Sequence, residues 1–128
     1  MSKLVSLLSM ALMLSGLATA SAQMSPDSTV ADPEVHQVAF ENDHVRVLRA
    51  LASPGHESAM HSHPPGLVIS LGTGRVRLTQ ADGTQQILDV NPGTIFWIDS
   101  IEHSWELLAG EVNVVAVEVK AAKAPATN

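Results

Sequence analysis

Cysteine is absent from this sequence of 128 residues. Disulfides, thiol catalysis and thiolate metal ligands are therefore excluded. Tyrosine is absent as well, so no phenol can serve as an acid, a base or a ligand anchor. Any metal ion would have to be held by histidine, aspartate or glutamate side chains.

Basic residues are also scarce, with 7 Lys and Arg against 13 Asp and Glu. Loss of Lys3 with the leader described below would leave 6 basic against 13 acidic residues, a net charge of −7 with histidine neutral. Binding to phosphate groups needs clustered Lys and Arg, so we expect neither nucleic acid nor anionic membrane as a partner. The length is enough for one small domain.

Residues 1–22 have the pattern of a cleavable signal peptide. Lys3 gives a positive start, residues 4–17 are almost entirely apolar, and Ala20-Ser21-Ala22 is a small-residue cleavage site. A retained membrane anchor is the alternative, but the apolar run is short for a span and no stop-transfer charges follow. We therefore expect a periplasmic or secreted protein without a stable membrane anchor.

The rest of the chain reads as a flexible lead-in at 23–34, a barrel domain at 35–120 and a disordered tail at 121–128. Within the domain, β-branched runs alternate with turn residues, and Asp82-Gly83 is the strongest hairpin signal, typical of a type I′ turn. Nine short strands favour a sandwich or a jelly-roll barrel. The predicted strands are 35–40, 45–51, 56–63, 67–71, 75–79, 85–90, 94–98, 103–108 and 112–119.

Two histidines are separated by one residue, at His61 and His63. Side chains alternate along a strand, so both point to one face and could share a metal ion. His103, on a later predicted strand, could supply a third nitrogen. Because ligand histidines must be neutral, metal binding through them should weaken as the pH falls below about 6 to 6.5.

The motifs around these histidines resemble those of the cupin superfamily. Pro54-Gly55, His61-x-His63 and Gly74 are similar to its first motif, and Gly93 to Asp99 followed by His103 is similar to its second. The resemblance covers roughly residues 37–120. It implies an all-β double-stranded β-helix, the jelly-roll cupin barrel, with one divalent metal held by His61, His63 and His103, and homodimers that pair through an edge strand.

The chain departs from the family pattern at one expected ligand. Where the first motif usually has a glutamate, counting back from Gly74 gives Leu67. Glu57, Asp99 and Glu102 are candidates to replace it. By strand parity we expect Leu67 to face the metal, and Trp105 and Leu107 to share the inward face with His103. His36, His44 and His56 are expected to be solvated or to lie at a loop edge.

These residues leave two functions open. Three neutral imidazoles would leave a divalent ion its full charge and open positions for water, O₂ or substrate. One reading is a dioxygenase-type oxidoreductase acting on a small anionic substrate, and the other is a non-catalytic periplasmic module that binds metal or a small ligand. The sequence does not decide whether the chain is an enzyme, and the metal could be Fe, Zn, Mn, Cu or Ni.

Overall fold

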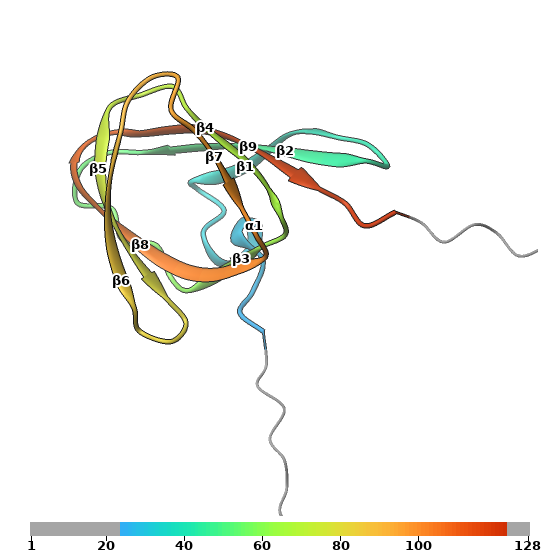
Figure 1. Cartoon of the computed structure of the whole chain (residues 1–128), viewed down its shortest axis with the longest axis horizontal. Coiled ribbons are helices and arrows are strands. Elements are labelled where there is room, and N and C mark those ends of the chain that lie inside the picture. The colour runs from blue at the N-terminus through green and yellow to red at the C-terminus, as the bar shows by residue number, and fades with distance from the viewer. Residues whose placement is uncertain (1–23, 123–128) are drawn as a thin grey trace, which may run out of the picture.

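Nine antiparallel strands and one short helix make up the computed structural model, which describes residues 24–122 (Figure 1). The predicted signal peptide and residues 123–128 of the predicted tail lie outside the described residues. The elements in chain order are α1 (Ser28–Ala31), β1 (His36–Glu41), β2 (Val45–Ala52), β3 (His61–His63), β4 (Gly66–Ser70), β5 (Gly74–Gln80), β6 (Gln85–Val90), β7 (Ile95–Ile98), β8 (Ile101–Gly110) and β9 (Val112–Val119).

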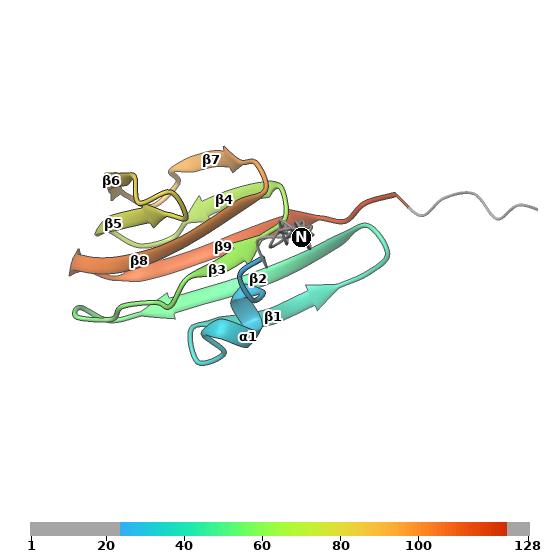
Figure 2. The ribbon, with the colours of Figure 1, turned by 90° about the horizontal axis from the view of Figure 1, so that it is seen from below.

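The strands form two sheets that enclose the core (Figure 2). The five-stranded sheet has the order β1-β2-β9-β4-β7, and the four-stranded sheet has the order β3-β8-β5-β6. Val35, Ala50, Trp105 and Leu107 are the buried centre of the core. The predicted all-β jelly-roll architecture is confirmed.

Alternation of buried and exposed side chains explains why these segments form strands. On β8, for example, Trp105 and Leu107 are buried while the residues beside them are more exposed. Each predicted strand overlaps an observed one, but the predicted strand 56–63 forms a ladder only at His61–His63. Gly66 begins β4 where a side chain would collide with the backbone of Val117 on β9, so the close approach of these two strands requires glycine.

The hairpin predicted at Asp82-Gly83 joins β5 to β6. Gly83 has φ 86°, and no other type of residue in the described part of the chain has positive φ. A type I′ turn needs positive φ at both central residues, so the predicted turn type is wrong although the hairpin is present. Asp82 instead accepts a hydrogen bond from the Thr84 N–H at 2.8 Å, which stabilises the loop.

Residues 24–34, for which we expected a flexible lead-in, pack against the barrel. Asp27 caps α1 by accepting from the Thr29 N–H, and Ser28 is fully buried. The Ser62 N–H donates to the Pro26 carbonyl at 2.8 Å, which joins this segment to β3. The segment therefore lies beside the strand that carries His61 and His63. Within residues 24–122, no helix has the length and apolar character needed to cross a membrane.

Candidate metal centre

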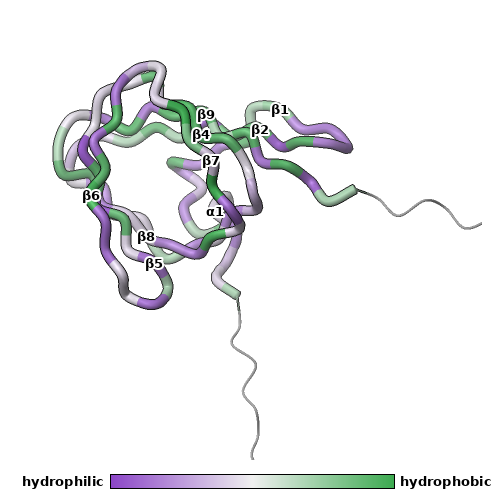
Figure 3. Tube along the Cα trace, in the orientation of Figure 1, coloured by the Kyte–Doolittle hydropathy of each residue, from purple (hydrophilic) through white to green (hydrophobic). Residues whose placement is uncertain are grey.

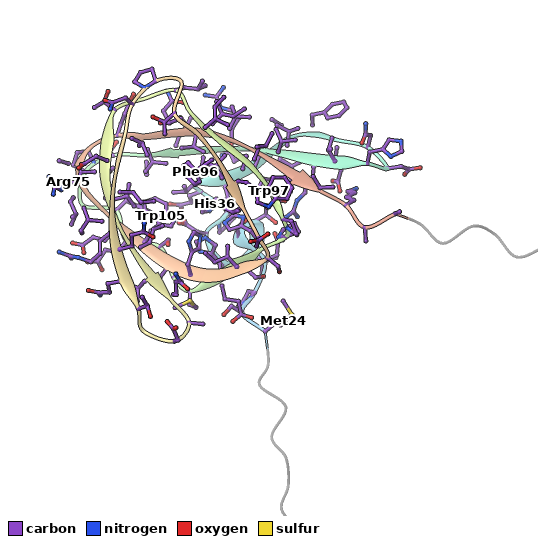
Figure 4. All side chains as sticks on the ribbon, in the orientation of Figure 1. Met24, His36, Arg75, Phe96, Trp97 and Trp105 are labelled. Atoms are coloured by element: carbon purple, nitrogen blue, oxygen red, sulfur yellow. The ribbon has the colours of Figure 1, made fainter. Side chains whose placement is uncertain are left out.

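Four histidines, His36, His61, His63 and His103, gather inside the barrel, and we call them the histidine cluster. β3 turns His61 and His63 to the same side, and His103 on β8 is the register partner of His61. The His61 ring lies 4.9 Å from that of His36, 4.9 Å from that of His63 and 4.8 Å from that of His103, measured between centroids. His36 is labelled inside the barrel in Figure 4.

The nitrogen atoms best placed to share one ion belong to His36, His61 and His63. One ring nitrogen from each of these buried residues lies within 4.8 Å of the others. The predicted set had His103 in place of His36. The His103 ring lies beside the rings of His61 and His63, at 4.8 Å and 5.3 Å, but its nitrogens are not part of that closest group.

His36 was expected to be solvated, and this expectation is wrong, because the residue is only 6% exposed. It begins β1 opposite Ala50 of β2, whose side chain is part of the core. Residues paired directly across two antiparallel strands point to the same face. The register of β1 on β2 would therefore have identified His36 as an inward residue, but the sequence alone does not give that register.

The ring of His61 is oriented by a backbone carbonyl. Its Nδ1 lies 2.7 Å from the Ala59 oxygen. A carbonyl oxygen only accepts, so Nδ1 carries the proton and donates, and Nε2 keeps its lone pair. That Nε2 is buried with no hydrogen-bond partner among the described residues, and the same holds for Nδ1 of His36 and both ring nitrogens of His103. A set of buried imidazole nitrogens without partners is compatible with the donor set of a metal site.

His63 is held by a buried carboxylate. Its Nδ1 lies 2.8 Å from Oε1 of Glu118, a residue only 1% exposed on β9. Arg46 on β2 donates from Nε to the other Glu118 oxygen at 2.6 Å and from Nη2 to Asp27 at 2.6 Å. A carboxylate behind a histidine fixes the orientation of the ring and raises its basicity toward a metal.

Sequence analysis missed Glu118, although the sequence contained a signal for it. Glu118 is the single carboxylate in the apolar run 112–119, and it shares the inward parity of Val114 and Ala116. Arg46 is its register partner on β2 and faces the same way. Opposite charges at inward positions of two apolar strands indicate a buried ion pair.

The carboxylates proposed to replace the missing glutamate lie elsewhere. Glu57 is exposed and makes a backbone β-bridge to Glu106 of β8, Asp99 accepts from the Trp97 indole at the surface, and Glu102 accepts from Ser25. Glu102 is next to His103 on β8 and so points to the opposite face of that strand. The cluster therefore contains histidines and no direct carboxylate ligand among the described residues.

Leu67 does not face the histidine cluster, so its predicted orientation is wrong. It is 40% exposed on the outer face of β4, whereas its neighbour Val68 lines the interior. Trp105 and Leu107 face inward as predicted, with Trp105 beside His36 and His56. His56 lies half-buried, with its Nε2 at 2.7 Å from Asp32, and His44 is exposed as expected.

Burial lowers the pKa of three histidines of the cluster, His36, His61 and His103. Burial, together with the repulsion of a second positive charge by the nearby His61 and His63, lowers the pKa of His36 to about 4. Burial and the neighbouring histidines lower the pKa of His103 to about 3, and burial also lowers the pKa of His61. These three imidazoles are therefore in the form that binds a metal at neutral pH.

An apolar cavity of ≈ 140 Å³ adjoins the cluster. His36, His63 and His103 line part of it, and most of the remaining lining consists of aliphatic and aromatic side chains from both sheets. Polar residues on the outer face of the four-stranded sheet pair with one another, as in the Arg75–Asp89 and Arg77–Glu106 ion pairs. The interior thus combines one polar centre with an apolar chamber, which is the usual composition of a small-ligand site.

Comparison with solved structures identifies the fold. A cupin domain from Bordetella pertussis Tohama I is similar with a TM-score of 0.61 and 21% sequence identity, over 79% of this chain and 100% of that one. A double-stranded β-helix protein from Klebsiella pneumoniae gives 0.55 and 22%, over 66% and 75%. A cupin-family protein from Methanocaldococcus jannaschii gives 0.55 and 16%, over 66% and 78%. No protein-family model and no curated protein matches the sequence.

The Arg46 ion pair with Glu118 should be essential for stability. Replacing Arg46 by leucine leaves a buried carboxylate without its cation, which we expect to lower the free energy of unfolding by about 3–5 kcal/mol. Arg75→Leu is the matched control, because its ion pair with Asp89 is exposed and worth about 0–1 kcal/mol. Urea unfolding measures both, and equal losses in the two variants would contradict the role of Arg46.

The metal-free protein should lose stability in mild acid. Histidines with a lowered pKa in the folded state stay unprotonated there but bind protons in the unfolded chain, so acid favours unfolding. The stabilisation is complete above pH 6.5 and should decrease from there toward pH 4 by about 1.4 kcal/mol per pH unit for His36 and for His103. Urea unfolding in chelator at several pH values measures the slope, which should be smaller in His36→Gln. A free energy of unfolding that does not change between pH 6.5 and 4.5 would contradict this prediction.

Proposed function

We propose that this chain is an exported protein of cupin fold that holds one divalent metal ion through its histidine cluster and uses it to bind a small ligand. The observation that carries the proposal is the buried group of His36, His61 and His63, whose ring nitrogens lie within 4.8 Å of one another. The ring of His103, the fourth member of the histidine cluster, lies against this group and offers a further nitrogen donor. His61 and His63 belong both to the predicted ligand set and to this group.

The donor set fits a transition-metal ion. Imidazole nitrogens suit Zn, Cu, Fe and Ni, and four of the buried nitrogens have no other partner among the described residues. Leaving such groups buried and unpaired costs about 1–3 kcal/mol each, which a metal–nitrogen bond would offset. Glu118 and the Ala59 carbonyl would orient two of the rings, so part of the ligand geometry is set before any ion binds.

A bound ion would supply Lewis acidity and open positions for O₂ or an oxygen-bearing ligand. The chain's own residues would hold the ion, keep its ligands neutral and exclude water with an apolar lining. No carboxylate lines the cavity among the described residues, so the cavity lining has no acid or base of its own besides the histidines. This favours a dioxygenase-type oxidoreductase, in which the chemistry comes from the metal, over a hydrolase that needs a separate base.

A non-catalytic binding module is the second candidate. The observation that favours it is the same lack of a carboxylate in the cavity. The two candidates differ in turnover: the iron-loaded oxidoreductase consumes oxygen with an oxidisable, oxygen-chelating substrate such as an enolate or a diol, whereas the binding module retains metal and ligand unchanged. Oxygen uptake across a panel of such compounds separates them.

Export of the chain is supported by its first 22 residues. Lys3, the apolar stretch 4–17 and the small residues Ala20-Ser21-Ala22 fit a cleaved signal peptide. We therefore place the protein in the periplasm or outside the cell. An exported chain without cysteine has no disulfide to stabilise it, and a metal centre would fill that role.

Metal content provides the first test of the proposal. Purified protein should contain close to one equivalent of metal by elemental mass spectrometry, and the double variant His61→Ala/His63→Ala should lose it, because both sets of candidate ligands contain these residues. His36→Ala and His103→Ala should each bind metal more weakly. His44→Ala is the matched control, since His44 is exposed in a turn, and it should keep the metal. Metal-free protein that also fails to bind added Zn²⁺ or Fe²⁺ would contradict the proposal.

In place of the edge-strand pairing that the resemblance implies, we further propose that two copies of the chain pair through the outer face of the five-stranded sheet. Register pairs join Phe40 to Val47, Val47 to Val117, Val117 to Leu67 and Leu67 to Trp97, so that one apolar side chain from each strand forms a continuous line. We call these five residues the outer row. Residues paired directly across a sheet share a face, and Figure 3 shows β4 and β9 as hydrophobic over much of their length.

The size and charge of this face fit a second copy of the chain. Five strands about 4.8 Å apart make the row about 20 Å wide, and Val115, Ile69 and Ile95 form a parallel apolar line about 7 Å away. With the width of the side chains added, the patch reaches about 400 Å², large for a monomer, and it could form the apolar centre of an interface of about 800 Å² per partner. The outer row carries no charge, so two acidic copies could meet there without repulsion at the centre.

Leu67→Glu should weaken this dimer by about tenfold or more, because it places a charge at the centre of the buried face. Ile87→Glu is the matched control, since Ile87 is similarly exposed, at 42%, but lies on the other sheet. Sedimentation velocity over a range of protein concentrations measures both variants. An unmodified protein that stays monomeric throughout, or a dimer that Leu67→Glu leaves intact, would contradict the proposed face.

A further inference from the structure

We infer that the ligand of this barrel has a small, uncharged, apolar body of about the size of benzene and carries one metal-chelating oxygen group. This inference rests on the proposed metal centre and specifies the ligand class of the same site. It narrows the anionic substrate expected from the sequence, because it confines the negative charge to the chelating group.

The lining of the cavity carries the inference. Val76, Leu78, Leu88 and Val90 of the four-stranded sheet face Phe96 and Ile98 of the other sheet across the chamber. Figure 4 shows Trp105 inside the barrel, and this residue lines the chamber as well. Apart from the histidines and Ser70, the lining is entirely apolar. Such walls offer mainly dispersion contacts to a bound molecule.

Charged side chains near the chamber are already engaged elsewhere. Arg75 and Arg77 on β5 alternate with the lining residues Val76 and Leu78, so they point to the outer face of the sheet, where they pair with Asp89 and Glu106. Arg46 is bound to Glu118 and Asp27. A charged group on the ligand body would therefore lose its water without gaining a partner, and such burial is strongly unfavourable.

The volume sets the size of the body. The cavity measures ≈ 140 Å³. A cavity of about 150 Å³ with aliphatic and aromatic walls stays dry and binds benzene. His36, His63 and His103 line the same cavity, so a molecule of this size could place its body in the chamber while its oxygen group reaches the cluster.

Three hydroxamates with a common chelating group test the inference on the metal-loaded protein. Benzohydroxamate has a phenyl body, 4-carboxybenzohydroxamate has a charged body, and acetohydroxamate has almost none. Isothermal titration calorimetry should find benzohydroxamate about tenfold or more tighter than either of the others, because only its ring is buried without a charge. Equal binding of benzohydroxamate and acetohydroxamate, or tighter binding of the charged compound, would overturn the inference.

Two variants on neighbouring residues locate the binding. Leu88 lines the chamber, whereas Ile87 beside it points outward. Leu88→Glu should abolish the preference for benzohydroxamate, and Ile87→Glu should keep it. Leu88→Trp, which fills the chamber without adding a charge, should also abolish it, and this second variant covers the case in which Leu88→Glu does not fold. Metal content should be unchanged in every folded variant, because the histidines are intact. A preference that survives in a folded Leu88 variant would overturn the inference.

Fluorobenzene and the metal-free protein separate this inference from the proposed metal centre. Fluorine NMR should detect saturable binding of fluorobenzene to the metal-free protein and its loss in Leu88→Trp. Absence of saturable binding would overturn the assigned cavity even if the protein binds metal. Conversely, binding of fluorobenzene by a protein that never takes up metal would support the apolar chamber and leave the metal proposal contradicted.

Discussion

The buried ion pair between Arg46 and Glu118 is the interaction on which the rest of the site depends. Glu118 has one oxygen on Arg46 and the other on the ring of His63. Arg46 continues to Asp27, which caps the helix of the N-terminal segment. One guanidinium thus joins the five-stranded sheet, the N-terminal segment and, through Glu118, a histidine of the other sheet. The carboxylate is fully desolvated, so the surrounding strands must stay in register to keep it paired.

The sequence predicted the fold and three members of the histidine cluster, His61, His63 and His103, because these depend on local signals. β-branched runs and turn residues located nine strands, and the spacing of His61 and His63 placed both on one face. His36 and the partners of Glu118 were missed because they depend on which strand lies beside which, and pairing between distant strands leaves no local pattern. Arg46 and Glu118 are 72 residues apart in the chain.

Leu67 shows where strand parity fails. β4 reads Gly-Leu-Val-Ile-Ser, and its neighbours β7 and β9 are nearly as apolar on both faces. Alternation between polar and apolar residues normally reveals which face is inside, but a strand that is apolar on both faces carries no such information. The same property gives the five-stranded sheet two apolar surfaces, one toward the chamber and one formed by the outer row. On β5, unlike β4, polar and apolar residues alternate clearly, because Arg75 and Arg77 alternate with the inward Val76 and Leu78.

The histidine cluster draws its members from both sheets, since His36 lies on β1 and the other three lie on β3 and β8. A metal ion bound there would tie together points of the chain that are far apart in sequence, closing large loops. Because the four histidines come together only in the folded barrel, the ion would bind the folded state and stabilise it by the free energy of binding. In a chain without cysteine, the cluster would act as a reversible crosslink that forms only after both sheets have met and that releases when its imidazoles take up protons.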